Sequence, residues 1–187
     1  MANNTPPNFL TVHAAATYPS MDIGVKEITQ WHLDRNWNTI GYHYVIRRDG
    51  TIEQGRPEHI VGAHVGNNNT KNIGICMAGG LKQGTKQPED NFTDAQYASL
   101  TRLLTELHSR YPNAQIRGHN EFKGYESRGC PCFRIDLYRE WITSAWKSLF
   151  LPDDWYSYDW KKGFDEDWNE VNIYRELPVV HTEFPSD

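Results

Sequence analysis

Arg117-Gly118-His119-Asn120, followed by Gly129-Cys130-Pro131-Cys132, is the stretch from which we predict the fold. A second anchor, Thr11-Val12-His13, lies far upstream. Together these stretches offer two imidazoles and a thiol, a ligand set that suits zinc. Three protein ligands leave one tetrahedral position open, which distinguishes catalytic zinc sites from structural ones. We therefore interpret the rest of the chain as a scaffold that brings residues 13, 119 and 130 together.

The same residues have other interpretations when each is taken alone. His13 follows a short apolar run, where a histidine is more often structural than a ligand, and Cys130 is compatible with a small buried apolar residue. Cys130-Pro131-Cys132 also fits a redox pair or half of a structural zinc site, although the chain lacks the second cysteine pair that a four-cysteine site needs. A cysteine nucleophile with a histidine base is a further option. Residue spacing alone leaves these alternatives open.

Runs of β-branched and aromatic residues, bounded by turn residues, predict the strands. The first run ends at His13, and the last leads into His119. Asp49-Gly50 is a strong hairpin signal between two others. We expect strands over residues 9–12, 42–48, 51–54, 72–78 and 114–118.

Apolar residues at helical spacing predict the helices. The longest begins at the capping box Thr93-Asp94-Ala95-Gln96 and runs to Tyr111, where Pro112 stops it. We expect helices over residues 25–36, 94–111 and 136–149. Strands that alternate with helices indicate an α/β fold, here a single domain with a central mixed sheet flanked by about three helices.

The chain divides by composition into two parts. Its 187 residues suffice for one domain, and 38% hydrophobic with 13% aromatic residues indicates a globular protein. We place this domain at residues 1–150. Residues 151–187 hold ten acidic but only three basic side chains, with aromatic rings between them that follow no sustained period. We interpret this C-terminal acidic-aromatic extension as a segment lying across the domain, or alternatively as one that docks a partner or covers a groove.

Several classes of protein are disfavoured by composition. No apolar run approaches the roughly 18–20 residues that span a bilayer, and the N-terminus does not resemble a secretory signal, so we expect no membrane partner. Three cysteines cannot form a fully paired disulfide framework, which favours a reducing cytoplasm. An acidic extension and a nearly neutral body argue against nucleic acid. We expect a monomer.

A set of collinear stretches, covering about residues 9–146, is similar to one known superfamily. The chain resembles the zinc amidases of the peptidoglycan-recognition superfamily (the amidase-2 type), and within it the small lysozymes of T-seven-like bacteriophages. The residues after 150 lie outside this resemblance. The matching stretches are Thr11–Thr17, Gly24–His32, Gly41–Arg56, Gly62-Ala63-His64, Asn72–Gly80, Asn91–Gln96, Arg117-Gly118-His119 and Cys130-Pro131.

The resemblance implies a reaction and its residues. It implies zinc-dependent hydrolysis of the amide between N-acetylmuramic acid and L-alanine in peptidoglycan, with His13, His119 and Cys130 as the Zn²⁺ ligands. Tyr42 would direct its hydroxyl toward the open position of the metal. Arg128 stands where the phage relatives have a lysine, which is a departure from the pattern. A guanidinium supplies charge but does not readily donate a proton. If the lysine acts as a proton donor, activity here should be weaker, or Tyr42 must serve.

Further positions are implied to face the substrate. His64 would either support a ligand or bind substrate, and the resemblance does not choose between these roles. Cys132 is expected not to be a ligand. The implied substrate-binding residues are Trp37, His43, Ala63, His64 and Asn69.

The resemblance also implies a biological setting, that of a phage endolysin acting in host lysis. Such a protein is made in the host cytoplasm and would reach the cell wall through a holin-type pore. One alternative is a peptidoglycan-binding protein without activity, but such proteins typically lack the zinc cysteine, which is present here. A second alternative is inhibition of a phage RNA polymerase, which T-seven-like lysozymes bind and which the acidic extension could assist or obstruct.

Overall fold

The strand that carries His13 lies inside the sheet rather than at its edge. The computed structural model describes residues 4–147, in which strand β1 (Phe9–Ala14) pairs in parallel with both β4 (Asn72–Met77) and β5 (Gln115–Gly118). β2 (Tyr44–Ile46) pairs in parallel with β4 and antiparallel with β3 (Ile52–Gln54), so the strand order is β3-β2-β4-β1-β5. The predicted mixed sheet is confirmed.

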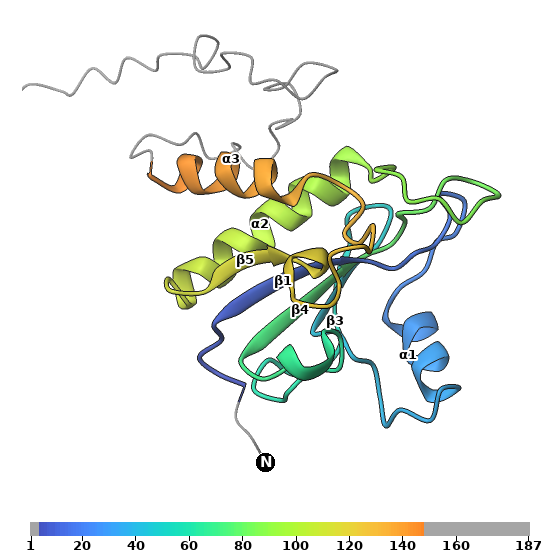
Figure 1. Cartoon of the computed structure of the whole chain (residues 1–187), viewed down its shortest axis with the longest axis horizontal. Coiled ribbons are helices and arrows are strands. Elements are labelled where there is room, and N and C mark those ends of the chain that lie inside the picture. The colour runs from blue at the N-terminus through green and yellow to red at the C-terminus, as the bar shows by residue number, and fades with distance from the viewer. Residues whose placement is uncertain (1–3, 148–187) are drawn as a thin grey trace, which may run out of the picture.

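The two faces of the sheet differ in chemistry because side chains alternate along each strand. Leu10 and Val12 of β1 join the apolar core beneath α2 (Asp94–Arg110) and α3 (Ile135–Lys147). Thr11 and His13 therefore face the opposite side, where α1 (Val25–Leu33) lies, as Figure 1 shows. This second face carries buried polar groups, and the site is built on it.

The helices begin largely where the sequence predicts, and their ends have identifiable causes. At the start of α2 the Thr93 hydroxyl accepts a hydrogen bond from Gln96 N, and the Gln96 side chain accepts one from Thr93 N. α1 ends at Leu33, earlier than predicted, and Asn36 then takes a left-handed conformation with φ of 60°. A left-handed residue cannot continue an α-helix.

The hairpin strands are shorter than predicted. β2 begins at Tyr44, although the backbone of His43 still accepts from Gly55 N and donates to Gly74 O. Arg47 N bonds to Thr51 O within the turn. The residues preceding β2 are thus held in place without being part of a regular ladder, and Tyr42 is one of them.

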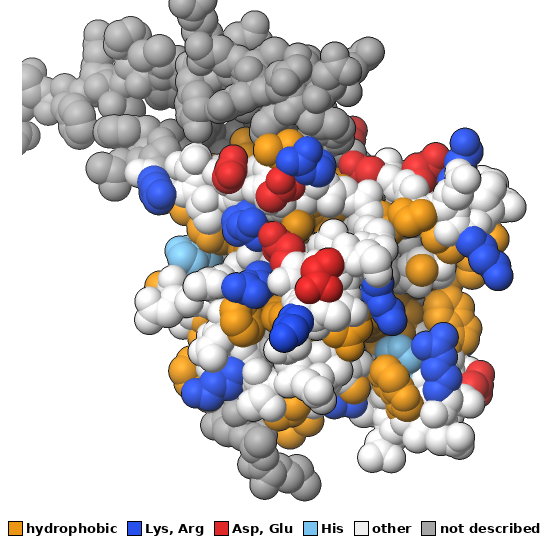
Figure 2. Space-filling view, in the orientation of Figure 1, with side chains coloured by type: hydrophobic (Ala, Val, Ile, Leu, Met, Phe, Trp, Pro, Cys, Tyr) orange, Lys and Arg blue, Asp and Glu red, His pale blue; other side chains and the backbone are white. Residues whose placement is uncertain are grey.

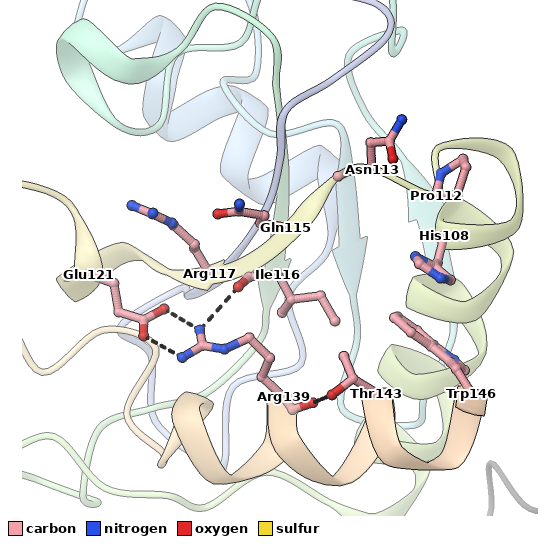
Figure 3. A pocket seen from close by; sticks show the side chains of 11 residues that line it. His108, Pro112, Asn113, Gln115, Ile116, Arg117, Glu121, Arg139, Thr143 and Trp146 are labelled. Atoms are coloured by element: carbon pink, nitrogen blue, oxygen red, sulfur yellow. Dashed lines mark hydrogen bonds and ion pairs between the residues drawn. The ribbon is translucent and has the colours of Figure 1, made fainter. Parts of the chain in front are cut away.

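β5 forms one edge of the sheet, and its outer side is blocked by side chains. Figure 3 shows Arg139 of α3 pointing between the Glu121 carboxylate and the backbone of Ile116. Glu121 also accepts a hydrogen bond of 2.9 Å from Gly118 N. A cavity of about 580 Å³ lies along this edge, bounded at its far end by the stacked rings of His108 and Trp146. None of the predicted site residues lines this cavity.

The surface in Figure 2 shows basic side chains distributed over this face, with acidic ones among them and no continuous field of one sign. Within residues 4–147, no helix is both long enough and apolar enough to cross a membrane. The acidic extension predicted for residues 151–187 lies outside the described residues.

Candidate metal centre

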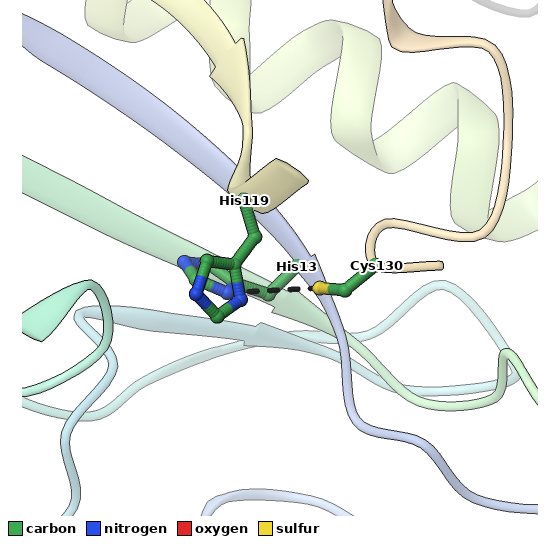
Figure 4. A group of neighbouring side chains, drawn as sticks. All are labelled: His13, His119 and Cys130. Atoms are coloured by element: carbon green, nitrogen blue, oxygen red, sulfur yellow. Dashed lines mark hydrogen bonds between the residues drawn. The ribbon is translucent and has the colours of Figure 1, made fainter. Parts of the chain in front are cut away.

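Two histidines come together because neighbouring parallel strands end at the same edge of the sheet. His13 is near the end of β1, and His119 begins the short helix η2 (His119–Glu121) directly after β5. Their ring centroids are 4.6 Å apart. Cys130, from the loop between η2 and α3, completes a cluster whose ligand atoms all lie within 4.8 Å of one another (Figure 4).

The thiol of Cys130 is held toward the histidines by the backbone. Ala14 N donates a hydrogen bond to its Sγ at 3.2 Å, and Asn120 N donates to its carbonyl oxygen at 3.1 Å. The Sγ lies 3.8 Å from His13 Nδ1. The loop is therefore tied to the ends of both histidine-bearing segments.

The imidazoles of the cluster are neutral at neutral pH. Burial lowers the pKa of His13 well below its ordinary value, with smaller contributions from His64 and His119. Burial, and then the charge of Arg128, lowers the pKa of His119 to about 4. Neutral rings keep the lone pairs with which histidine binds metals.

The cluster has the properties of an ion site. His119 Nε2 is buried and, among residues 4–147, has no hydrogen-bond partner. Burial raises the pKa of Cys130 to about 12, so a thiolate here needs a nearby positive charge. A divalent cation would supply that charge and engage the unpartnered nitrogen. Two imidazoles and one thiol fit Zn²⁺ with one position left open.

Tyr42 lies beside the cluster, with its ring centroid 5.2 Å from that of His13. Burial raises its pKa well above the ordinary value, and the neighbouring thiols of Cys76 and Cys130 add to this. The phenol is therefore protonated and able to donate a hydrogen bond.

Arg128 is exposed, and it rests on an aromatic ring. Its guanidinium carbon lies 5.1 Å from the centre of the Tyr125 ring, and that ring lies 4.5 Å from the ring of His119. A Cβ added at Gly66 would meet the Tyr125 hydroxyl at 2.5 Å. Tyr125 thus connects His119, Arg128 and the loop at Gly66. It was not singled out from the sequence; an aromatic residue between His119 and Cys130 is the signal that could have revealed it.

Two of the predicted substrate residues lie near the surface. Trp37 is 38% exposed, and its ring packs on His32 at 4.5 Å. Ala63 is partly exposed, and its backbone N donates to Gly41 O at 3.0 Å. They flank the segment that leads into Tyr42.

The other three predicted substrate residues have their polar atoms engaged within the protein. His43 is fully buried, with Gly74 N donating to Nδ1 and with Nε2 bonded to Ile60 O. The Asn69 side chain accepts from the backbone of residues 64 and 65 and donates to Gly66 O. His64 bonds to His13 and to Asn72 O. His43 and Asn69 therefore support the backbone around the site, and contact of either residue with substrate stays a prediction.

Comparisons with known proteins point in one direction. The family model described as N-acetylmuramoyl-L-alanine amidase matches residues 3–133, a span that includes all three cluster residues. The endolysin of Enterobacteria phage K11 is 44% identical over 134 residues, covering 72% of this chain and 84% of that protein. The endolysin of Escherichia phage T7 is 45% identical over 130 residues, covering 70% and 82%. A solved structure, the N-acetylmuramoyl-L-alanine amidase LysC from Clostridium intestinale URNW, has a TM-score of 0.58 and 30% identity, covering 75% and 85%.

Proposed function

The chain belongs to the N-acetylmuramoyl-L-alanine amidase family, and we propose that it works through a zinc ion held by His13, His119 and Cys130. It is an amidase of the phage endolysin type, and it hydrolyses the amide between N-acetylmuramic acid and L-alanine in peptidoglycan. The observation that supports the zinc site is the convergence of two neutral imidazoles and a buried thiol within 4.8 Å.

The protonation states of the proposed ligands favour metal binding. His13 and His119 are neutral, so no proton has to leave either ring for a lone pair to be available. Cys130 receives a backbone hydrogen bond from Ala14, which favours its thiolate. Zinc, when bound at such a site, supplies Lewis-acid polarisation of the scissile carbonyl and a water of lowered pKa.

Tyr42 and Arg128 have complementary roles in this proposal. The Tyr42 phenol stays protonated and donates a hydrogen bond to the oxygen on which negative charge develops. Arg128 contributes fixed positive charge, and Tyr125 holds it next to His119. A guanidinium does not readily release its proton, and the raised pKa of the phenol keeps its proton on Tyr42, so the two groups act by positive charge and by hydrogen bonding.

We propose that Trp37 and Ala63 contact the substrate. The partly exposed Trp37 ring, tilted against His32, presents an apolar face to a sugar or peptide. Trp37→Ala should lower the affinity for sacculi and leave zinc content unchanged.

Mass spectrometry of digested sacculi tests the reaction together with its metal. An amidase releases stem peptides with a free L-alanine amine and leaves intact glycan strands. Treatment with a zinc chelator should abolish release, and added zinc should restore it. Cleavage within the glycan or the peptide, or activity that resists complete removal of zinc, would contradict the proposal.

We propose that the protein reaches the cell wall through a holin-type pore. Expression in a Gram-negative host should then lyse cells only when a pore-forming protein is co-expressed or the inner membrane is permeabilised. Lysis by the protein alone would contradict this route.

Binding to a phage RNA polymerase stays a prediction drawn from the resemblance. A pull-down with the full chain and with a chain ending at residue 150 tests both the binding and any effect of the acidic extension. Gel filtration of the same samples tests the expected monomer.

A further inference from the structure

We propose that His64 is a positioning residue that fixes the tautomer of His13, so that His13 Nδ1 is left free for the metal. The inference rests on the proposed zinc site and assigns His64 a role in assembling it. The geometry is a relay of two imidazoles that ends on a backbone carbonyl.

The relay determines where the protons lie. His64 Nε2 is 3.3 Å from Asn72 O, and a carbonyl oxygen can only accept, so this nitrogen carries the proton. The other nitrogen of a neutral His64, Nδ1, is then an acceptor, and it lies 3.0 Å from His13 Nε2. His13 Nε2 must carry a proton to complete the bond. His13 Nδ1 is consequently unprotonated, and it is the nitrogen 3.8 Å from Cys130 Sγ.

The end of the relay is anchored. Asn72 O also accepts from the Asn4 side chain at 3.2 Å, and Asn72 N donates to the same side chain at 3.0 Å. Thr11 donates to the Asn72 side chain at 2.7 Å. The carbonyl that orients His64 is therefore fixed by contacts with both the N-terminal segment and β1.

The backbone is shaped to admit the His64 ring. A Cβ added at Gly74 would lie 2.7 Å from ring carbons of His64, and one added at Gly62 would lie 2.6 Å from its Cδ2. The His64 ring also meets the His13 ring edge to face, with centroids 5.0 Å apart. The absence of a side chain at both glycines thus leaves the space that the imidazole fills.

The alternative role, direct substrate binding, does not agree with this environment. His64 is only 9% exposed, and both ring nitrogens face protein partners. Within residues 4–147, no carboxylate hydrogen-bonds to the imidazole of His13 or His64, and His64 Nδ1 is the partner of His13 Nε2. A hydrogen-bonded partner of a metal-binding histidine typically changes metal affinity about 10–100-fold when it is removed.

Two substitutions separate the effect of the His64 hydrogen bond from the effect of filling the space with a ring. His64→Phe keeps an aromatic ring in this space but removes the acceptor. His64→Asn keeps an acceptor near the position of Nδ1 and serves as the conservative variant. Near-ultraviolet circular dichroism and urea unfolding establish that each variant is folded.

The first measurement is zinc affinity, by competition with a chromophoric chelator and independent of catalysis. We expect His64→Phe to bind zinc about 10–100-fold more weakly than the wild type, with His64→Asn in between. The fraction of metal-free protein that co-sediments with sacculi should be the same for both variants as for the wild type. Wild-type zinc affinity in folded His64→Phe, or a loss confined to sacculus binding, would overturn the inference.

The second measurement observes the tautomer directly. In the metal-free wild type, ¹⁵N NMR of the ring nitrogens should show His13 protonated at Nε2 and unprotonated at Nδ1, and His64→Phe should disturb this pattern. A proton on His13 Nδ1 in the wild type would overturn the inference even if zinc binds. Failure of the wild type to bind zinc would instead remove the proposed metal site, on which the inference rests.

Discussion

Arg128 shows how one exposed side chain is held beside a buried site. Tyr125 lies between it and His119, with one ring contact to each. The charge of Arg128 contributes to the lowered pKa of His119, so the guanidinium acts electrostatically on the cluster. The structure therefore supports an electrostatic role for Arg128 and not a role as proton donor.

Arg128→Gln should therefore lower kcat by about 10²–10³-fold, the usual effect of losing one stabilising group for an oxyanion. Arg128→Lys keeps the charge and should retain most of the activity. Tyr125→Leu should lower kcat less than Arg128→Gln, because the arginine is still present but no longer held. Kinetics on sacculi, with zinc content measured in parallel, test this series. Full activity in Arg128→Gln at normal zinc content would exclude the role.

The buried imidazoles make the metal-free protein sensitive to acid. The folded-state pKa is about 3 for His64 and about 4 for His119, both lowered mainly by burial. The unfolded-state value is about 6.5. The unfolded chain therefore binds protons that the folded chain does not, and stability is full above about pH 6.5 and falls as the pH drops toward 4.

Urea unfolding in the presence of a chelator, at pH values from 7.5 down to 5, measures this effect. Each histidine should contribute a loss of up to about 1.4 kcal/mol per pH unit. His64→Asn removes one of these groups and should flatten the dependence. A free energy of unfolding that does not change between pH 6.5 and 5 would contradict the buried neutral state.

At the scale of elements, β5 forms one edge of the sheet and leads directly into His119, a proposed metal ligand. Glu121 accepts from Gly118 N at the end of the strand, and Arg139 joins Glu121 to the carbonyl of Ile116 (Figure 3). These contacts occupy backbone groups that an edge strand otherwise leaves open to another chain. They also fix the residue directly before His119.

Glu121→Ala should lower the free energy of unfolding by about 1–3 kcal/mol, since it removes the acceptor of Gly118 N and the carboxylate partner of Arg139. Glu121→Gln keeps an acceptor and should cost less. Glu106→Ala is the matched control, because Glu106 forms an exposed pair with Arg110, and such pairs contribute little. Equal urea midpoints for Glu121→Ala and Glu106→Ala would show that the edge contacts are not stabilising.

The elements that the sequence predicted well have local causes. Thr93 and Gln96 form the capping box within four residues of chain, and Asp49-Gly50 sets a tight turn. The short β2 was not foreseen, because the segment before it is held by backbone pairing with distant residues such as Gly74. The end of α1 at Leu33 was missed because the helical spacing of apolar residues does not reveal the left-handed Asn36.

The site, too, has features that local sequence predicts and features that only the folded chain shows. His13, His119 and Cys130 stand in recognisable motifs, and the structure brings them together. The burial of His43 depends on packing against β4 and the loop at Ile60, which no local pattern reveals. Tyr125 was missed because its contacts to His119 and Arg128 exist only in the folded loop.

At the scale of the whole molecule, the proposed site lies within the part of the chain that the structure describes. The cluster, Tyr42 and Arg128 all lie between residues 13 and 130. We propose a domain boundary near residue 150, because the composition changes there to acidic and aromatic residues.

A chain ending at residue 150 should therefore fold, bind zinc and cleave sacculi with the kcat of the full chain. Thermal unfolding, zinc content and muropeptide release, each compared with the full chain, test the boundary. Loss of zinc or of folding in the shortened chain would show that the acidic-aromatic extension is part of the domain.

The most direct test of the account is zinc content per chain in protein purified without added metal. The wild type should hold about one zinc, as three-ligand catalytic sites do. Cys132→Ser should match it, because that thiol lies outside the cluster, and Cys130→Ser should lose most of its metal. A wild type that holds no zinc even after reloading, or a Cys130→Ser variant that retains it in full, would contradict the metal centre on which the mechanism depends.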